Sequence, residues 1–133
     1  MSAKMSERVS AASAQTILVV DDFDDTRLMM RLWLERCGYR VVEAANGLEA
    51  VEVARRESPA LIIMDIEMPE MNGLTASRKI REVESLRDVP IVAVSAYGAE
   101  SWRDRAIEAG CNEYVSTPFD PKSLIQLIQS FLS

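Results

Sequence analysis

Histidine is missing from this sequence altogether. Its absence excludes Ser-His and Cys-His nucleophilic pairs, imidazole zinc sites and acid/base catalysis by imidazole. Cysteine is scarce, because only Cys37 and Cys111 are present and their spacing is neither metal-like nor redox-like. We expect both to stay reduced, in a cytoplasmic protein, and to pack as small hydrophobic residues beside glycines at helix ends. Any chemistry must therefore depend on carboxylates, hydroxyls, backbone amides and hard metal ions.

Long apolar runs and clusters of positive charge are lacking as well. No apolar run approaches the roughly 18 residues of a membrane span, and the N-terminus lacks the apolar region of a signal peptide. The 15 basic and 21 acidic residues give a formal net charge of −6, with no cluster of Lys and Arg. We therefore expect no nucleic-acid partner and no membrane association.

Length and composition indicate one folded domain. The chain has 133 residues, of which 48% are hydrophobic and 27% are charged, as in ordinary globular proteins. Residues 1–15 are polar and rich in Ser and Ala, which predicts a disordered N-terminal tail before a domain at 16–133.

Apolar runs typical of buried strands alternate with helical segments along this domain. In Leu61–Asp65, four apolar residues end on a carboxylate, and Pro69 and Asn72-Gly73 mark an irregular loop after them. The predicted strands span residues 16–20, 39–44, 61–65, 90–95 and 113–115. The predicted helices span residues 23–36, 74–83, 99–109 and 121–132, with one more between Asn46-Gly47 and Ser58-Pro59. This alternation predicts a doubly wound α/β fold, with helices on both faces of a parallel sheet.

Some large side chains on the predicted helices are expected to pack inward. In the first helix these are Trp33 and the two methionines, Met29 and Met30. Trp102 fits the core slightly better than a contact surface. The side chains expected on the apolar side of the second helix are Leu48, Val51 and Val53.

Polar side chains follow the predicted strands at the point where each strand ends. They are Asp21 and Asp22, Asp65, Ser95 and Ser116-Thr117. Because parallel strands point the same way, their carboxyl ends share one rim, where open α/β sheets bind ligands. Three carboxylates in one crevice repel one another unless a proton or a cation neutralises them, and Mg²⁺ prefers such oxygen ligands. A carboxylate can itself be the nucleophile in phosphoryl transfer, although the acids near Asp21 taken alone could be mere helix caps.

From about Thr16 to Leu132 the chain resembles the receiver domain of two-component response regulators. The matching stretches are Ile17–Asp22, Asp65–Gly73, Val94–Ala96, Ala109–Val115 and Pro118-Phe119. The resemblance implies a flavodoxin-like five-stranded sheet of order 2-1-3-4-5. It also implies a Mg²⁺-dependent transfer of a phosphoryl group from a histidine kinase or a histidine phosphotransfer protein. Such a domain is a signalling switch and not an enzyme, beyond phosphorylating and dephosphorylating itself.

The resemblance also implies roles for the residues at the strand ends. Asp65 would accept the phosphoryl group. Asp22 and Asp65 would bind Mg²⁺ directly, Asp21 largely through water, and the backbone carbonyl of Glu67 would complete the metal site.

Further roles concern signalling. Ser95 and Tyr114 would form the switch, and Glu67 and Tyr97 would tune how fast the phosphoryl group is hydrolysed. The output partner would dock on the last two helices and the strand between them. We expect a monomer or weak dimer, and no attached output domain, because the chain ends at Ser133 soon after the last helix.

Thr117 departs from the family pattern, which has a lysine before the proline that is Pro118 here. A lysine would form an ion pair with the acyl phosphate, whereas threonine offers a hydrogen bond but no charge. This leaves two hypotheses, a phosphorylation-dependent switch and a receiver-like interaction module that works without phosphate. An aspartate-nucleophile phosphatase fits less well, because such enzymes have a second Asp two residues after the nucleophile, where this chain has Glu67. The resemblance also suggests a cis Thr117-Pro118 bond, which the sequence alone leaves open.

Overall fold

The computed structural model describes residues 15–68, 71–96 and 100–132, and these residues form one five-stranded sheet. Its strands are β1 (Thr16–Val20), β2 (Arg40–Ala44), β3 (Leu61–Asp65), β4 (Ile91–Ser95) and β5 (Glu113–Ser116). Every neighbouring pair is parallel, and the strand order is β2-β1-β3-β4-β5. The predicted doubly wound α/β fold and its 2-1-3-4-5 order are therefore confirmed.

Five α-helices alternate with these strands in the described part of the chain. They are α2 (Asp24–Arg36), α3 (Gly47–Glu57), α4 (Gly73–Glu82), α5 (Glu100–Glu108) and α6 (Pro121–Leu132). The predicted bounds agree to within a few residues, and Phe23 is the N-cap of α2 and not its first residue. The sequence pattern does not predict the short 3₁₀ helix at Glu84–Leu86. No helix of the described ranges is both long and apolar enough to cross a membrane.

The predicted N-terminal tail lies outside the described residues, except for Gln15. The carbonyl oxygen of Gln15 accepts a hydrogen bond from the backbone amide of Arg40, 2.9 Å away. This contact extends the β1–β2 pairing by one residue beyond the predicted boundary.

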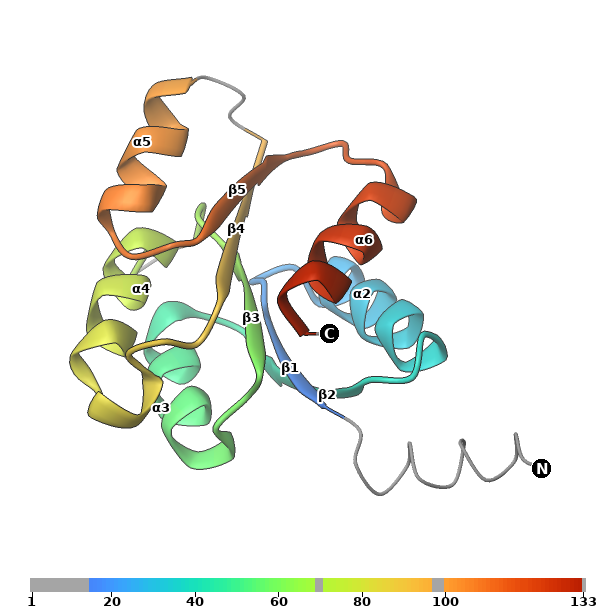
Figure 1. Ribbon diagram of the computed structural model, residues 1–133, viewed down its shortest axis with the longest axis horizontal. Coiled ribbons are helices and arrows are strands. Elements are labelled where there is room, and N and C mark those ends of the chain that lie inside the picture. The colour runs from blue at the N-terminus through green and yellow to red at the C-terminus, as the bar shows by residue number, and fades with distance from the viewer. Residues whose placement is uncertain (1–14, 69–70, 97–99, 133) are drawn as a thin grey trace.

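Helices cover both faces of the sheet, with α3, α4 and α5 on one face and α2 and α6 on the other (Figure 1). Successive strand residues point to opposite faces, so β1 sends Leu18 and Val20 into one core and Ile17 and Val19 into the other. All four side chains are at most 2% exposed. Burial on both faces explains why these strands are continuous apolar runs and not alternating patterns.

The expectation that both methionines of α2 pack inward is wrong for Met29. Met30 and Trp33 are partly buried against the core beneath α2, but Met29 is 71% exposed. Phe23 and Leu32 are exposed as well. Because apolar residues surround much of this helix, their spacing alone does not indicate which side faces the sheet.

Two further expectations are corrected. Leu48 is 55% exposed, although Val53 on the same helix is buried. Cys37 is exposed, whereas Cys111 is buried as expected. Trp102 packs partly buried against the core under α3, α4 and α5, in agreement with the sequence.

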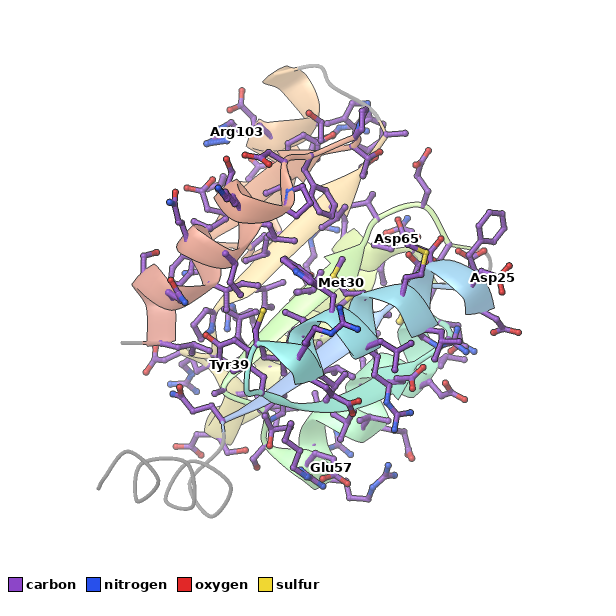
Figure 2. All side chains as sticks on the ribbon, turned by 90° about the vertical axis from the view of Figure 1, so that its right-hand side faces the viewer. Asp25, Met30, Tyr39, Glu57, Asp65 and Arg103 are labelled. Carbon is purple, nitrogen blue, oxygen red and sulfur yellow. The ribbon has the colours of Figure 1, made fainter. Side chains whose placement is uncertain are left out.

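The strand order places the carboxyl ends of β1, β3 and β4 side by side. Figure 2 shows Asp65, the last residue of β3, at the same end of the molecule as Asp25 in the first turn of α2. Tyr39, which follows the other end of α2, lies far from Asp65 in this view. The rim predicted from the sequence is therefore present at this end of the sheet.

Gly73 fixes the loop that follows Asp65. Its amide donates to the carbonyl oxygen of Ile66 at 3.0 Å, and Asn72 caps α4 by accepting a hydrogen bond from the amide of Thr75 at the same distance. A Cβ atom on Gly73 would collide with the carbonyl oxygen of Asp65 and with the Met64 side chain. Only glycine allows this close approach, so the start of α4 packs directly against the end of β3.

Gly73→Ala is expected to lower the free energy of unfolding by about 1–3 kcal/mol, because the added methyl group overpacks a site that backbone atoms enclose. Urea unfolding followed by circular dichroism measures this change. Lys79→Ala, at an exposed position on the same helix, serves as the control and should have little effect. An unchanged midpoint for Gly73→Ala would contradict the close approach.

Candidate functional site: an acidic crevice at the carboxyl edge of the sheet

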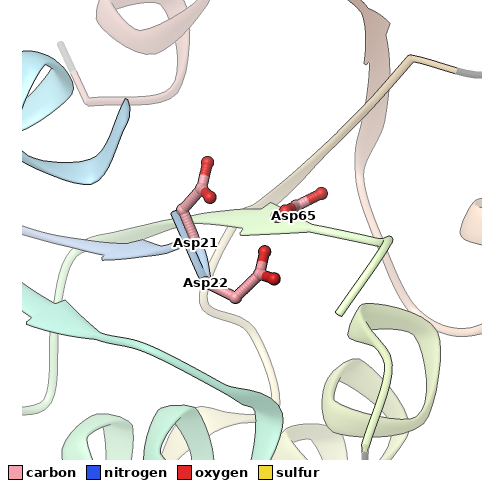
Figure 3. A group of neighbouring side chains, drawn as sticks. All are labelled: Asp21, Asp22 and Asp65. Carbon is pink, nitrogen blue, oxygen red and sulfur yellow. The ribbon is translucent and has the colours of Figure 1, made fainter. Parts of the chain in front are cut away.

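Three carboxylates meet at the carboxyl ends of β1 and β3. Asp21, Asp22 and Asp65 each offer one oxygen atom, and these atoms lie within 4.8 Å of one another. Their side chains project into the same space from two adjacent strand ends (Figure 3). The convergence predicted from the sequence is confirmed for these three residues.

Backbone hydrogen bonds hold two of these side chains in place. Asp21 Oδ1 accepts from the amide of Phe23 at 2.9 Å, and Asp65 Oδ1 accepts from the amide of Glu67 at 3.1 Å. In each case a carboxylate caps the turn that follows its own strand. One oxygen of each carboxylate is thus anchored by a backbone amide.

The electrostatics of the cluster are unfavourable in the absence of a cation. Burial, followed by repulsion from Asp21, raises the pKa of Asp65 from 3.8 to about 7, and the hydrogen bond from Glu67 offsets only part of this. Burial also raises the pKa of Asp21, against the lowering effect of the Phe23 amide. Repulsion between acids that cannot separate is relieved by a proton or by a hard divalent cation. An all-oxygen donor set of this kind suits Mg²⁺, so the residues present fit that ion.

These acids open into a crevice of about 550 Å³. The residues that line it are Val19, Val20, Asp21, Asp22, Phe23, Thr26, Met30, Ile63, Asp65, Glu67, Val94, Ser95, Ala96, Thr117 and Phe119. Within the described ranges its lining includes no Lys or Arg. The position where the family carries a cation is therefore occupied by the neutral side chain of Thr117.

Ser95 and Thr117 approach the crevice from β4 and from the chain just after β5. Ser95 is 2% exposed, and its carbonyl oxygen accepts a hydrogen bond from the amide of Thr117 at 2.8 Å. Ser116 pairs with Ser95 in the sheet register but does not line the crevice. The Thr117-Pro118 peptide bond is cis, as the resemblance suggested.

Of the remaining predicted site residues, Glu67 lines the crevice, whereas Tyr114 is not part of its lining. Tyr114 on β5 is buried, at 8% exposure, and its hydroxyl has no hydrogen-bond partner among the described residues. Glu67 is exposed, lines the crevice, and its Oε1 accepts a long hydrogen bond of 3.4 Å from the amide of Ala96. Tyr97 lies outside the described residues. The structure thus places Glu67 between the ends of β3 and β4.

Sequence reasoning missed Arg27, which contacts the backbone of the acidic pair. Its guanidinium group donates to the carbonyl oxygen of Asp21 at 2.7 Å. The signal available was weak, since an arginine on the second turn of a helix is ordinarily a solvated charge. Only the packing of α2 against β2 shows that this side chain is held at the site.

Together, the parallel sheet of order 2-1-3-4-5 and an acid cluster at its carboxyl edge define a doubly wound α/β domain with an acidic crevice at the edge where such folds bind ligands. The model of the response regulator receiver domain matches residues 17–129, and the chain belongs to this family. It is a family of two-component signal transduction proteins. Of the described site residues expected from the resemblance, all but Tyr114 line the crevice, and Tyr114 is buried in the core.

Comparisons with individual proteins agree with this assignment. An uncharacterized 14.6 kDa protein of Leptolyngbya boryana is 41% identical over 115 residues, which are 86% of this chain and 88% of that protein. The polar-differentiation response regulator DivK of Brucella anthropi is 33% identical over 118 residues, with 89% and 96% of the two chains covered.

Two solved structures extend the comparison to the fold. Chemotaxis protein CheY4 of Vibrio cholerae matches with a TM-score of 0.84 at 27% identity, covering 89% of this chain and 98% of CheY4. The receiver domain of a Pseudomonas aeruginosa sensor histidine kinase matches with a TM-score of 0.82 at 35% identity, covering 89% and 97%. The latter structure has a magnesium ion coordinated in its active-site cleft.

Proposed function

We propose that the protein is a phosphorylation-dependent signalling domain whose phosphoacceptor is Asp65. The observation that supports this most directly is the cluster of three carboxylates within 4.8 Å, at the rim where doubly wound folds bind ligands. The receiver of known structure with magnesium in its cleft supports the choice of cation. Asp22 and Asp65 would hold Mg²⁺ directly, Asp21 largely through water, and the carbonyl of Glu67 would complete the set.

The reaction at Asp65 is a displacement at phosphorus. One Asp65 oxygen forms a bond to the phosphorus atom of a phosphohistidine donor while the phosphorus–nitrogen bond breaks, and the imidazole nitrogen keeps the electron pair. Bound Mg²⁺ would neutralise charge on the phosphoryl oxygens, and catalysis in such a transfer is mostly positioning and charge neutralisation. The hydrogen bond from the amide of Glu67 fixes one Asp65 oxygen and leaves the other for attack.

The signal would leave the site through Ser95 and Tyr114. Ser95 lines the crevice, where its hydroxyl can donate to a phosphoryl oxygen. Tyr114 is on the adjacent strand β5, and a buried hydroxyl without a partner costs about 1–3 kcal/mol, so its inward position is easily shifted. The face made by α5, β5 and α6 would then present the change to an output partner. Glu67, at the mouth of the crevice, would tune the rate of hydrolysis together with Tyr97.

Incubation with Mg²⁺ and a small phosphoryl donor, acetyl phosphate or phosphoramidate, tests the proposal. Intact-mass spectrometry is expected to show one added phosphoryl group on the wild type, none on Asp65→Asn, and none when EDTA removes Mg²⁺. Asp104→Asn, on an exposed part of α5, is the control and should label like the wild type. Absence of labelling at saturating donor would reject the phosphoacceptor function.

A second function follows from Thr117. Since no described cation lines the crevice, the domain could bind its partner without reading a phosphoryl group. In that case the partner's affinity for the protein would be equal for the wild type and Asp65→Asn. The carboxylate cluster favours the phosphoacceptor, because an interaction surface alone gives no reason to bring three repelling, partly buried acids together.

A further inference from the structure

Arg27 connects three parts of the structure that meet beside the acidic pair. Its Nε donates to Glu43 Oε1 at 2.8 Å, its Nη1 to the carbonyl oxygen of Asp21 at 2.7 Å, and its Nη2 to Asp24 Oδ1 at 2.7 Å. The side chain is only 15% exposed, so these bonds are better shielded than those of a surface arginine. The planar guanidinium group thus joins β2, the first turn of α2 and the turn after β1.

The contact to Asp21 falls on the peptide unit that joins Asp21 to Asp22. The amide of Asp21 is already held by the carbonyl oxygen of Ala44 at 3.1 Å, and the amide of Phe23 holds its side chain. Arg27 adds a restraint on the carbonyl oxygen of the same residue. With these atoms fixed, the Asp21-Asp22 peptide is restrained at the point where the two side chains leave the backbone, and one oxygen of each lies within 4.8 Å of an Asp65 oxygen.

Glu43 keeps the arginine in this orientation. Although burial acts against it, hydrogen bonds from Arg31 and Arg27 hold the pKa of Glu43 below its ordinary value. Arg31 occupies the other oxygen, with Nη1 2.7 Å from Glu43 Oε2, and its Nε bonds Glu35 and not the site. The two arginines therefore share one acid, and of the two only Arg27 hydrogen-bonds the acidic pair within the described residues.

We propose that Arg27 is a positioning residue for the acidic pair, acting through the carbonyl oxygen of Asp21 to preorganise the Mg²⁺ site. The inference rests on the proposed function in so far as it takes Mg²⁺ as the ion bound there. Residues that orient metal ligands through hydrogen bonds typically change metal affinity by about 10–100-fold when they are replaced. Arg27 matters more in this chain because Thr117 supplies no charge to hold the carboxylates in place.

The sign of the effect separates positioning from simple electrostatics. A positive charge near a cation site opposes cation binding, so Coulomb interaction alone predicts that removing Arg27 tightens Mg²⁺ binding. A positioning role predicts that removing Arg27 weakens Mg²⁺ binding. Without Arg27, binding would have to order the acidic pair, and this costs free energy. Arg27→Lys keeps the positive charge but loses the planar set of guanidinium N–H donors. Its effect on Mg²⁺ affinity therefore measures the contribution of geometry apart from that of charge.

The experiment measures Mg²⁺ binding by isothermal titration calorimetry for the wild type, Arg27→Lys, Arg27→Met and Arg31→Met. Arg31→Met is the matched control, since it removes a charge from the same Glu43 without touching Asp21. We expect both Arg27 variants to bind Mg²⁺ roughly tenfold or more weakly, and Arg31→Met to bind as tightly as the wild type or more tightly. Urea unfolding of each metal-free variant shows whether it is folded, and Arg27→Lys is the variant expected to keep the fold if Arg27→Met does not.

Each outcome bears on one claim. Weaker binding by folded Arg27→Lys together with unaffected binding by Arg31→Met supports the positioning role. Wild-type affinity in Arg27→Lys, or tighter binding in Arg27→Met, overturns it while leaving the phosphoacceptor proposal intact. If the wild type binds no Mg²⁺, the metal site of the proposed function is rejected, and the role of Arg27 is rejected with it.

Discussion

In metal-free buffer at about pH 8, Asp65→Asn is expected to be more stable than the wild type by about 2 kcal/mol. Burial, followed by repulsion from Asp21, raises the pKa of Asp65 to about 7 in the folded protein, from an ordinary value of 3.8. Between about pH 4 and pH 7 the native state therefore holds a proton that the unfolded chain has already released. Wild-type stability accordingly falls as the pH rises from about 4 to about 7, and the loss persists above that range. The full shift corresponds to about 4 kcal/mol, which we halve because the carboxyl group is only half-buried.

Urea unfolding of both proteins between about pH 4 and pH 8 in EDTA measures this difference. The difference in stability between Asp65→Asn and the wild type should become small near the acidic end, where the carboxyl is protonated in the native state and about half protonated in the unfolded chain. Asp104→Asn, which alters an exposed carboxylate on α5, should follow the wild type throughout. A gap that does not change with pH would show that the charge on Asp65 is not its cause.

Mg²⁺ should reverse the order of stability. A ligand that binds only the native state adds about 2.7 kcal/mol at a concentration of about 100 times its Kd. The wild type offers the ion three carboxylates, whereas Asp65→Asn offers two. Mg²⁺ should therefore stabilise the wild type strongly at neutral pH and Asp65→Asn weakly. Equal stabilisation of the two proteins by Mg²⁺ would show that the ion binds at a site that does not include Asp65.

The site could be predicted from the sequence as far as strand geometry determines it. Parallel strands bring their carboxyl ends to one edge, so a polar residue after each apolar run suffices to predict that Asp21, Asp65 and Ser95 converge. The continuous apolar runs identified the strands because both faces of this sheet are covered. The strands can thus be recognised from the local apolar pattern, and the convergence of their polar ends follows from the rule that parallel strands end at the same edge of the sheet.

What the sequence could not predict depends on three-dimensional packing. Met29 and Leu48 have the apolar side chains of a core, but in the described part of the structure both are more than half exposed. Arg27 and Glu43 are 16 positions apart, and only the docking of α2 on β2 brings them together. The raised pKa of Asp65 likewise depends on how deeply the end of β3 is buried. Each of these requires knowing which surfaces meet.

Thr117→Lys is expected to have the second large effect, because it restores a cation to a crevice whose described lining has none. A full charge about 4 Å from a carboxylate is worth about 4 kcal/mol at an effective dielectric of 20, before desolvation is subtracted. The net effect should lower the pKa of Asp65 by roughly 1–3 units. In metal-free buffer, replacing Asp65 with Asn should therefore raise the free energy of unfolding less in the Thr117→Lys background than in the wild-type background.

Two controls separate charge from shape. Thr117→Val removes the hydroxyl without adding charge and should leave the pKa of Asp65 high. Ser116→Lys adds the same charge one residue earlier, where the side chain points to the other face of β5, and should also have little effect. If Ser116→Lys changes the pH profile as much as Thr117→Lys, the effect is one of net charge and not of the crevice.

Coupling to Tyr114 is the functional consequence of the same substitution. In the wild type, the hydroxyl groups of Thr26, Ser95 and Thr117 line the crevice, and no Lys or Arg among its described lining residues would pull a phosphoryl group on Asp65 toward β5. A lysine at position 117 would bind it more strongly and draw the start of the following loop inward, beside buried Tyr114. We therefore expect phosphorylated Thr117→Lys to show a larger change in tyrosine absorbance and in the NMR signals of Tyr114 than the phosphorylated wild type. Equal responses would show that threonine suffices, and that this receiver signals by hydrogen bonds where its family uses a charge.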